Sequence, residues 1–260
     1  MENPHERHHR RRLDFTGKSV TGAGSGIGRA TALSFAAQGA KVVVADINAN
    51  GAAAIKEIEI TGGTALPVTG DLSDQTVVDK VIATTVDSFG GLDVLVNNAG
   101  IMDGPDATGD LDDAVWERSI RINLTAPFLL TRAALPHLLR AGKGAIVNTA
   151  SATSLRGSVA GTAYTVSKHG IIGLTKATAV QHRDIGVRIN AVAPGGVQTN
   201  IQIGESEGAV GPAVFAAYQN NIGRLAQADE LAATIAFLAS DAASDINGVV
   251  LPVHNGWSAV

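Results

Sequence analysis

The chain has 260 residues, of which 45% are hydrophobic, and its formal net charge is −4. This length and apolar content suit one large domain or two small ones, and the small acidic charge gives no indication of a nucleic acid or an anionic membrane as the main partner. The absence of cysteine excludes disulfides, thiolate catalysis and cysteine-ligated zinc and fits a reducing, cytoplasmic location, while no apolar run approaches the ~18 residues of a membrane helix.

Residues 1–12 differ from the rest of the chain, because they carry four arginines, three histidines and two glutamates without apolar periodicity. Such a composition cannot offset the entropy of ordering, so we expect a disordered N-terminal arm followed by a single domain over residues 13–260. The pair Arg11-Arg12 lacks the apolar stretch of an export signal. The four remaining histidines are too far apart for a helical metal pair, so no metal site is expected.

From residue 13 onward, strand-like runs alternate with longer segments of helical periodicity. Strands are predicted over residues 18–20, 41–46, 64–69, 93–99, 144–150, 187–193 and 248–253. Helices are predicted over residues 27–38, 49–61, 75–89, 112–123, 127–140, 163–183 and 229–238, with the fourth and fifth nearly continuous. This alternation predicts an α/β, doubly wound, Rossmann-type three-layer fold around a seven-stranded parallel sheet. Ligands bind such sheets beyond the carboxyl ends of the strands, where the strand order reverses.

The stretch Thr21-Gly22-Ala23-Gly24-Ser25-Gly26-Ile27-Gly28 joins the first strand to the first helix. Its four glycines let the backbone turn sharply and approach a ligand, and the free N–H groups at the helix start suit a pyrophosphate. An ordinary glycine-rich turn is the alternative interpretation. The spacing is T-G-x-x-x-G-x-G, which differs from the common dinucleotide pattern G-x-G-x-x-G.

Asp46 ends the second predicted strand, 18 residues after Gly28. An acidic residue at this distance accepts hydrogen bonds from the adenosine ribose and repels the 2′-phosphate of NADP. At ~4 Å and an effective dielectric of about 20, this repulsion approaches roughly 4 kcal/mol per unit charge. Because no lysine or arginine lies within the glycine loop or directly after Asp46, we expect NAD as the cofactor.

Ser151, Tyr164 and Lys168 form the most informative pattern in the chain. Tyr164 and Lys168 are four residues apart and share one face of a predicted helix. A tyrosine ionises near pH 10 on its own, but an adjacent ammonium and an oxidised nicotinamide favour the phenolate, so the phenol becomes a usable base. Ser151, at the end of the fifth predicted strand, can hydrogen-bond the substrate oxygen as charge develops on it.

Three further segments follow predicted strands: Asp71-Leu72, Asn97-Asn98-Ala99-Gly100 and Pro194-Gly195-Gly196-Val197-Gln198-Thr199. In their order and spacing, all these motifs together resemble the classical short-chain dehydrogenase/reductase family from about Phe15 to Ser258. The resemblance implies a set of cofactor-binding residues. They are Gly22, Ser25, Gly26, Ile27, Gly28, Asp46, Asp71, Leu72, Asn98, Ala99, Gly100, Tyr164, Lys168, Pro194, Gly195, Val197 and Thr199.

The resemblance also implies that Asn123 joins Ser151, Tyr164 and Lys168 as a fourth catalytic residue. In the family, a local break in the helix at this asparagine holds a water that relays protons from the lysine. Pro127 is consistent with such a break, although Asn123 at a simple helix end is the alternative.

The first predicted strand departs from the family pattern. The first strand of the family has several apolar residues before T-G, whereas residues 18–20 are about two residues short, which places Lys18 or Ser19 where an apolar side chain is expected. A central strand of this kind should be less stable.

Residues 200–224 lack clear periodicity and predict a long loop, either a lid over the substrate or a disordered segment.

The resemblance implies an NAD-dependent oxidoreductase that interconverts a small-molecule secondary alcohol and a ketone. The segments from Ser151 to Gly157 and from Asn255 to Trp257 are closer to family members that act on cyclic or small alcohols. A 3-oxoacyl-carrier-protein reductase is the alternative within the family, and a non-catalytic dinucleotide sensor is the alternative of another class. Family members commonly pair the long helices, here about 112–140 and 163–183, across two-fold axes, so a homotetramer is expected.

Overall fold

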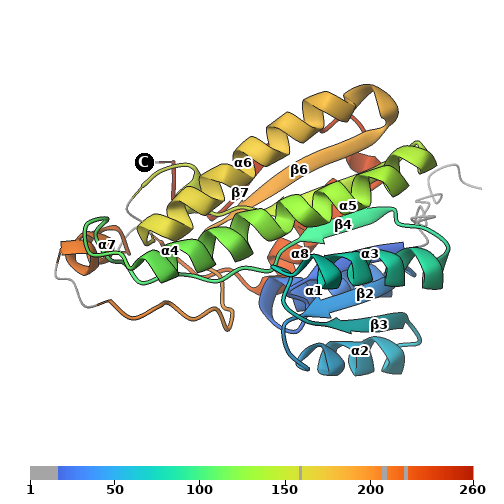
Figure 1. Cartoon of the computed structure of the whole chain (residues 1–260), viewed down its shortest axis with the longest axis horizontal. Coiled ribbons are helices and arrows are strands. Elements are labelled where there is room, and N and C mark those ends of the chain that lie inside the picture. The colour runs from blue at the N-terminus through green and yellow to red at the C-terminus, as the bar shows by residue number, and fades with distance from the viewer. Residues whose placement is uncertain (1–16, 158–159, 207–209, 220–221, 260) are drawn as a thin grey trace, which may run out of the picture.

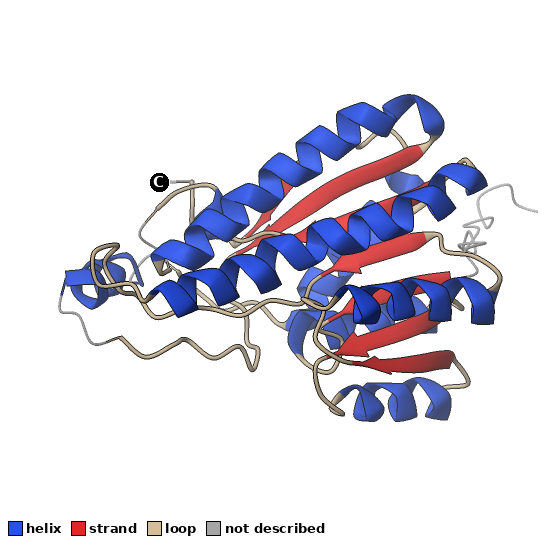
Figure 2. Cartoon of the chain, viewed as in Figure 1, coloured by secondary structure: helices blue, strands red, loops and turns tan. Residues whose placement is uncertain are grey.

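Seven parallel strands form one sheet in the order β3-β2-β1-β4-β5-β6-β7 (Figures 1 and 2). The strands are β1 (Gly17–Thr21), β2 (Lys41–Asp46), β3 (Thr64–Thr69), β4 (Val94–Asn97), β5 (Gly144–Thr149), β6 (Val187–Pro194) and β7 (Val250–Val253). The structure, a computed structural model, describes residues 17–157, 160–206, 210–219 and 222–259. The predicted arm over residues 1–12 lies outside them. The predicted parallel sheet is confirmed.

Helices cover both faces of the sheet, so the predicted three layers are present. They are α1 (Gly26–Ala37), α2 (Gly51–Ile60), α3 (Gln75–Phe89), α4 (Asp113–Ile120), α5 (Ala126–Ala141), α6 (Thr162–His182), α7 (Val210–Gln219) and α8 (Ala228–Ala239). In Figure 1, α3, α5 and α6 lie in front of the sheet and α1 and α8 lie behind it. The strand order reverses between β1 and β4, where doubly wound sheets bind their ligands.

The alternation of side chains along each strand divides the core between the two faces. Val42 and Val44 of β2 join a buried cluster with Phe35 of α1, while Val43 and Ala45 join a second cluster under α3 and α5. A strand that is buried on both sides has a continuous apolar sequence, as the central VVVA of β2 does.

β1 confirms the expectation of a polar side chain at the centre of the sheet. Lys18 and Ser19 are both fully buried, and β1 pairs with β2 from Gly17 to Thr21. The Lys18 ammonium lies 4.0 Å from the centre of the Phe35 ring. Burial lowers the pKa of Lys18 to about 8, against the opposing attraction of Asp93. Ser19 shares a hydrogen bond of 2.6 Å with the Thr85 hydroxyl of α3.

The two predicted helices over residues 112–140 form one continuous helical rod with a local defect. A π-helical turn, Arg121–Thr125, joins α4 directly to α5. Pro127 lies just after this turn, near the start of α5. Such turns open the regular hydrogen-bond ladder and are frequent at functional sites.

The segment 200–224 differs from the predicted loop, because Val210–Gln219 forms α7. The helix lacks a buried face among its described residues, and it contains Gly211 and Pro212 near its start, so it carries no clear amphipathic pattern. Before α7, the Ser206 hydroxyl bonds Asp106 at 2.5 Å. In Figure 1, α7 projects beyond the carboxyl ends of the strands.

Candidate active site

A pocket of about 840 Å³ opens at the carboxyl edge of the sheet around the switch point between β1 and β4. It brings together segments that follow all seven strands. Nearly all the predicted site residues line it: Gly22, Ser25, Gly26, Ile27, Asp46, Asp71, Leu72, Asn98, Ala99, Gly100, Ser151, Tyr164, Lys168, Pro194, Gly195, Val197 and Thr199. The structure therefore gathers most of the predicted site residues around one pocket, and Gly28 and Asn123 are the two that lie outside its lining.

The glycine loop forms a cradle on the β1 side of the pocket. Gly22 and Gly26 adopt left-handed φ angles of +61° and +51°, which favour glycine. A Cβ at Gly22 would lie 2.9 Å from the Cα of Ala99, and one at Gly26 would lie 3.0 Å from the Thr199 side chain. Gly28 lies behind the cradle, where a Cβ would collide with the Gly22 carbonyl, so its part is to let α1 pack closely.

Asp46 connects the end of β2 to the glycine loop. Its Oδ2 accepts a hydrogen bond from the Gly24 N–H at 2.8 Å, and its Oδ1 accepts one from the Asn48 N–H at 3.3 Å. The next residue, Ile47, is apolar and exposed. Arg29 of α1 forms an ion pair with Glu57 of α2. The Asp46 carboxylate thus lies in the pocket beside the glycine loop, and neither of the next two residues, Ile47 and Asn48, is basic.

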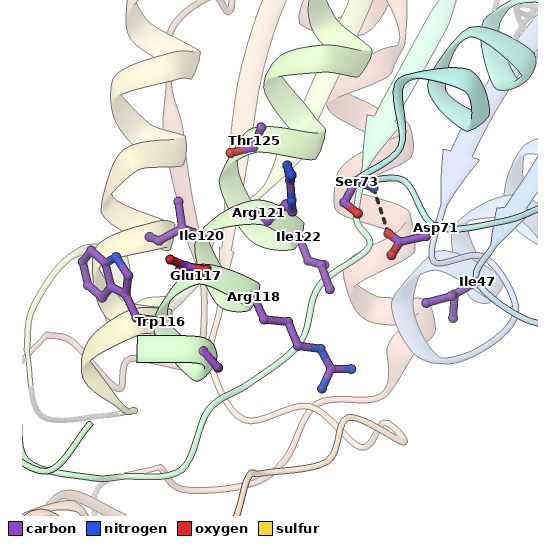
Figure 3. A pocket seen from close by; sticks show the side chains of 11 residues that line it. Ile47, Asp71, Ser73, Trp116, Glu117, Arg118, Ile120, Arg121, Ile122 and Thr125 are labelled. Atoms are coloured by element: carbon purple, nitrogen blue, oxygen red, sulfur yellow. Dashed lines mark hydrogen bonds between the residues drawn. The ribbon is translucent and has the colours of Figure 1, made fainter. Parts of the chain in front are cut away.

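The end of the pocket next to Asp71 and Leu72 also contains Arg118 and Ile122, neither of which the sequence predicted. Figure 3 shows the Arg118 side chain extending from α4 toward the side where Asp71 and Ile47 lie. Asp71 accepts a hydrogen bond from the Ser73 N–H at 2.8 Å, which fixes the turn after β3. An outer groove of about 680 Å³ adjoins this end and shares Ile47, Asp71, Arg118 and Ile122 with the main pocket. The position of Ile122, directly before Asn123, was the only available sequence signal.

The turn after β4 is bonded to the end of β1. The Thr21 hydroxyl accepts hydrogen bonds from the Asn98 and Ala99 N–H groups at 2.9 and 3.0 Å. The Asn98 side chain donates in turn to the Thr21 carbonyl at 3.0 Å. These bonds link the end of β1 to the turn after β4 at the switch point and hold this turn against the glycine loop.

The structure brings the predicted catalytic residues Ser151, Tyr164 and Lys168 together on one wall of the pocket. Ser151 follows β5, and its hydroxyl accepts a hydrogen bond from the Thr153 N–H at 3.3 Å. Lys168 is 3% exposed, lies 5.4 Å from the centre of the Tyr164 ring and donates to the Thr149 carbonyl at 2.8 Å.

Burial shifts the ionisation of both groups on α6 toward their neutral forms. Burial raises the pKa of Tyr164 to about 12, although a hydrogen bond from Ser151 opposes the shift and the charge of Asp103 adds to it. Burial lowers the pKa of Lys168 to about 8. The protein without its ligands therefore holds Tyr164 as a protonated phenol at neutral pH.

Asn123 is fully buried in the π-helical turn behind the pocket. Its side chain exchanges two hydrogen bonds of 2.9 Å with the backbone of Ile101 and donates to the Ser167 hydroxyl at 3.3 Å. A Cβ at Gly100 would lie 3.1 Å from the Asn123 oxygen and 3.5 Å from the Lys168 ammonium. Asn123 thus lies next to Lys168 at a helix defect, although it does not line the pocket.

The end of the pocket beyond Tyr164 is mostly apolar. It is lined by Met102, Thr153, Gln202, Ile203, Phe215, Gln219, Ile222, Leu225 and Trp257. None of these described residues carries a charge. Trp257 packs on Ala152 and Ile222, which brings the C-terminal segment against the start of the loop after β5. The sequence pointed to residues 200–224 and to Asn255-Gly256-Trp257 as candidates for the substrate region, but it did not predict which of their side chains line the pocket.

These residues fit a nicotinamide dinucleotide. The glycine loop lines the pocket with backbone conformations that favour glycine, the Asp46 carboxylate lies beside this loop, and a buried lysine lies beside the candidate acid–base residue. Within the described residues there is no cluster of histidine and acidic side chains able to hold a metal ion. In the same part of the chain, no helix combines the length and apolar character needed to span a membrane.

Comparison with known proteins assigns this arrangement to a family. The short chain dehydrogenase profile matches residues 19–209. The chain is 42% identical to cis-4-hydroxycyclohexanecarboxylate dehydrogenase of Sinomonas cyclohexanicum over 93% of this chain and 96% of the relative. It is also 42% identical to cyclohexanol dehydrogenase of Acinetobacter sp. (strain SE19), over 92% of this chain and 94% of that protein.

Solved structures agree with this assignment. The crystal structure of levodione reductase superimposes with a TM-score of 0.84 at 34% identity, covering 94% of this chain and 97% of the other. A crystal structure of an Agrobacterium tumefaciens protein with bound NADP gives a TM-score of 0.80 at 34% identity, covering 94% and 96%. With the profile match, the sequence relatives and the shared fold, this chain belongs to the short-chain dehydrogenase family.

Proposed function

We propose that this protein is an NAD-dependent dehydrogenase that interconverts an uncharged, cyclic secondary alcohol and its ketone, with Tyr164 as general base and acid. The proposal rests above all on one observation. The Tyr164 and Ser151 side chains face a single pocket whose far end is apolar and whose near end is the glycine cradle. A reacting carbon can therefore lie between a proton-transfer group and a dinucleotide.

The chain's own residues divide the reaction between them. The Ser151 hydroxyl orients the substrate oxygen, and Tyr164 takes the alcohol proton in oxidation or donates it in reduction. Lys168 supplies a positive charge 5.4 Å from the phenol ring, which favours the phenolate. Asn123 stabilises the π-helical turn beside Lys168. By family resemblance, a water held at this turn relays protons from Lys168. A bound nicotinamide supplies the hydride acceptor or donor.

The protonated state of Tyr164 favours carbonyl reduction, unless nearby positive charge stabilises the phenolate. A phenol with a pKa of about 12 is ready to donate a proton at neutral pH. Oxidation requires the phenolate, so positive charge from Lys168 and from an oxidised nicotinamide must overcome the burial of Tyr164. The alcohol-oxidation rate should therefore rise with pH.

NAD is the proposed cofactor because of Asp46. Its carboxylate is fixed by Gly24 and Asn48 at the end of β2, where a 2′-phosphate would be repelled. Arg118 is the basic side chain that lines the same end of the pocket. A related structure contains NADP, so kcat/KM of this protein with NAD and with NADP has to be measured directly.

An uncharged ring is the proposed substrate class. The described residues at the substrate end offer apolar side chains and neutral amides or hydroxyls. Arg156 is not among them, since its guanidinium donates to the Trp257 carbonyl and lies 5.5 Å from the Trp257 ring. Of the two relatives named above, the cyclohexanol dehydrogenase has the better matched substrate, because the other acts on a carboxylate.

The test is a screen of the purified full-length chain with NAD and NADP against cyclic, linear and charged secondary alcohols, together with a 3-oxoacyl thioester in the reductive direction. We expect turnover of cyclohexanol with NAD and at least about tenfold lower kcat/KM for 4-hydroxycyclohexanecarboxylate, whose charge would lose its hydration in an apolar pocket. Binding of NAD without any turnover would support a dinucleotide sensor. Preference for the thioester with NADP would support a carrier-protein reductase.

A further inference from the structure

Asp103, in the loop after β4, contacts the start of the helix that carries Tyr164. Its carboxylate Oδ2 accepts hydrogen bonds from the Ala163 N–H at 2.9 Å and from the Tyr164 N–H at 3.2 Å. The residue at the N-cap position of α6 is Gly161, which has no side chain to accept these bonds. A residue about sixty positions earlier therefore caps the helix in its place.

The contact between the loop and the helix is close. A Cβ on Gly161 would lie 2.4 Å from the Oδ1 of Asp103 and 2.1 Å from the Gly104 carbonyl oxygen. Glycine at position 161 thus leaves the space that the Asp103 carboxylate occupies. The carboxylate is held between two backbone segments and fixes the first turn of α6 relative to the end of β4.

The carboxylate is also a charge in a poorly hydrated place. Asp103 is 4% exposed, and its Oδ1 has no hydrogen-bond partner among the described residues. Burial raises the pKa of Asp103, against the backbone hydrogen bonds that lower it, and the nearby Asp106 adds to the increase. The groups around Tyr164 are the Lys168 ammonium, 5.4 Å from the centre of its ring, the Ser151 hydroxyl and the Asp103 carboxylate, which accepts from its backbone N–H.

We propose that Asp103 is a positioning residue for Tyr164. Asp103 anchors the first turn of α6 and places a negative charge at the start of the helix, next to the backbone of Tyr164. This inference rests on the proposed acid–base role of Tyr164. The negative charge disfavours the phenolate, so it opposes Lys168 and holds Tyr164 as a proton donor. Asp103 thereby moves the pH range of alcohol oxidation upward and supports carbonyl reduction near neutral pH.

Two variants separate the anchor from the charge. Asp103→Asn keeps an oxygen that can accept both N–H bonds but removes the charge, so we expect the pH profile of kcat for alcohol oxidation to move down by about one unit. Asp103→Ala removes both, so we expect kcat to fall at least about tenfold as Tyr164 loses its placement. Asp106→Asn is the matched control, because it makes the same change three residues later, where the carboxylate bonds Ser206. Its profile should stay in place.

A spectroscopic titration tests the same idea without turnover. The chain has two tyrosines, and Tyr218 of α7 is exposed, so Tyr218→Phe leaves Tyr164 as the single phenol. In that background, phenolate absorbance of the folded protein should appear at lower pH with Asp103→Asn and remain unchanged with Asp106→Asn. Circular dichroism over the same range checks that the fold persists.

The outcomes distinguish this inference from the proposed function. If the wild type turns over alcohols but Asp103→Asn shifts neither the kinetic profile nor the phenolate titration, the charge has no such role. If Asp103→Ala retains full kcat, the hydrogen bonds from α6 to Asp103 have no role in placing Tyr164. A wild type that turns over no alcohol would remove the proposed function, whereas the phenolate titration would still measure the effect of Asp103 on Tyr164.

Discussion

The Gly24 N–H donates a hydrogen bond to the Oδ2 of Asp46 across 2.8 Å, which joins the glycine loop to the end of β2. This bond fixes a negative charge in the pocket, where we propose that the adenosine ribose binds. Any group placed there, a hydroxyl or a phosphate, meets a carboxylate whose orientation is already determined.

The first prediction concerns cofactor choice. We expect kcat/KM to be at least about tenfold higher with NAD than with NADP, since even a third of the roughly 4 kcal/mol repulsion amounts to that ratio. Asp46→Ala should narrow the gap. Asp71→Ala is the control, because Asp71 is a second carboxylate of the same pocket, and we expect it to contact the adenine, which NAD and NADP share. Its loss should therefore leave the ratio unchanged. Equal use of both cofactors by the wild type would contradict the prediction.

The second prediction concerns the candidate acid–base pair. Tyr164→Phe removes the hydroxyl that transfers the proton and should lower kcat by about 10²–10⁴, while NAD affinity measured by calorimetry stays within a few-fold. Lys168→Ala should lower both, because the ammonium favours the phenolate and, by family resemblance, also holds the nicotinamide ribose. Tyr218→Phe changes an exposed tyrosine of α7 and serves as the control. Turnover that survives Tyr164→Phe would end the assignment.

The third prediction concerns Lys18 and stability. Because burial lowers its pKa from 10.5 to about 8, unfolding takes up a proton between these values, and the free energy of unfolding should rise with pH across this window. Below pH 8 the buried ammonium costs about 3 kcal/mol. Lys18→Met should therefore raise the free energy of unfolding at pH 7 by about 1–3 kcal/mol and flatten its rise toward pH 10.

Denaturant unfolding at several pH values measures this effect. Lys41→Met is the matched control, since Lys41 is the exposed first residue of β2 and its loss should change stability by less than about 0.5 kcal/mol. A destabilised Lys18→Met variant would show that the charge, with its attraction to Asp93, contributes more than burial costs.

The fourth prediction concerns assembly. We expect a homotetramer, because the long helices expose large apolar side chains, among them Trp116 of α4, Phe128 of α5 and Val180 of α6. Phe128→Glu would bury a charge in such an interface and should reduce the mass measured by light scattering to that of a dimer or monomer. Ile60→Glu, on α2 at the opposite edge of the sheet, is the control. A wild type that is monomeric at micromolar concentration would contradict the prediction.

The sequence predicted the sheet, the order of most of its strands and helices along the chain and a large group of residues that line one pocket. The reason is that these features depend on local pattern. Periodicity marks each strand, and residues that follow parallel strands meet at one edge of the sheet. Asp46, Asn98, Ser151 and Pro194 therefore meet around the pocket although they are far apart along the chain. The departure at Lys18 was also visible, because a charged residue interrupts an expected apolar run.

Only the tertiary structure decided which side chains complete the site. α7 shows no clear helical pattern, so its position over the pocket follows from contacts with other loops. Arg118 and Ile122 enter the pocket because α4 and the π-helical turn after it pass the end of the pocket near Asp71. Asp103 reaches the first turn of α6 only because Gly161 lets two distant backbone segments approach. Periodicity and motif spacing describe neighbours along the chain, whereas these contacts depend on how separate loops pack on one another, and that is fixed only when the whole chain has folded.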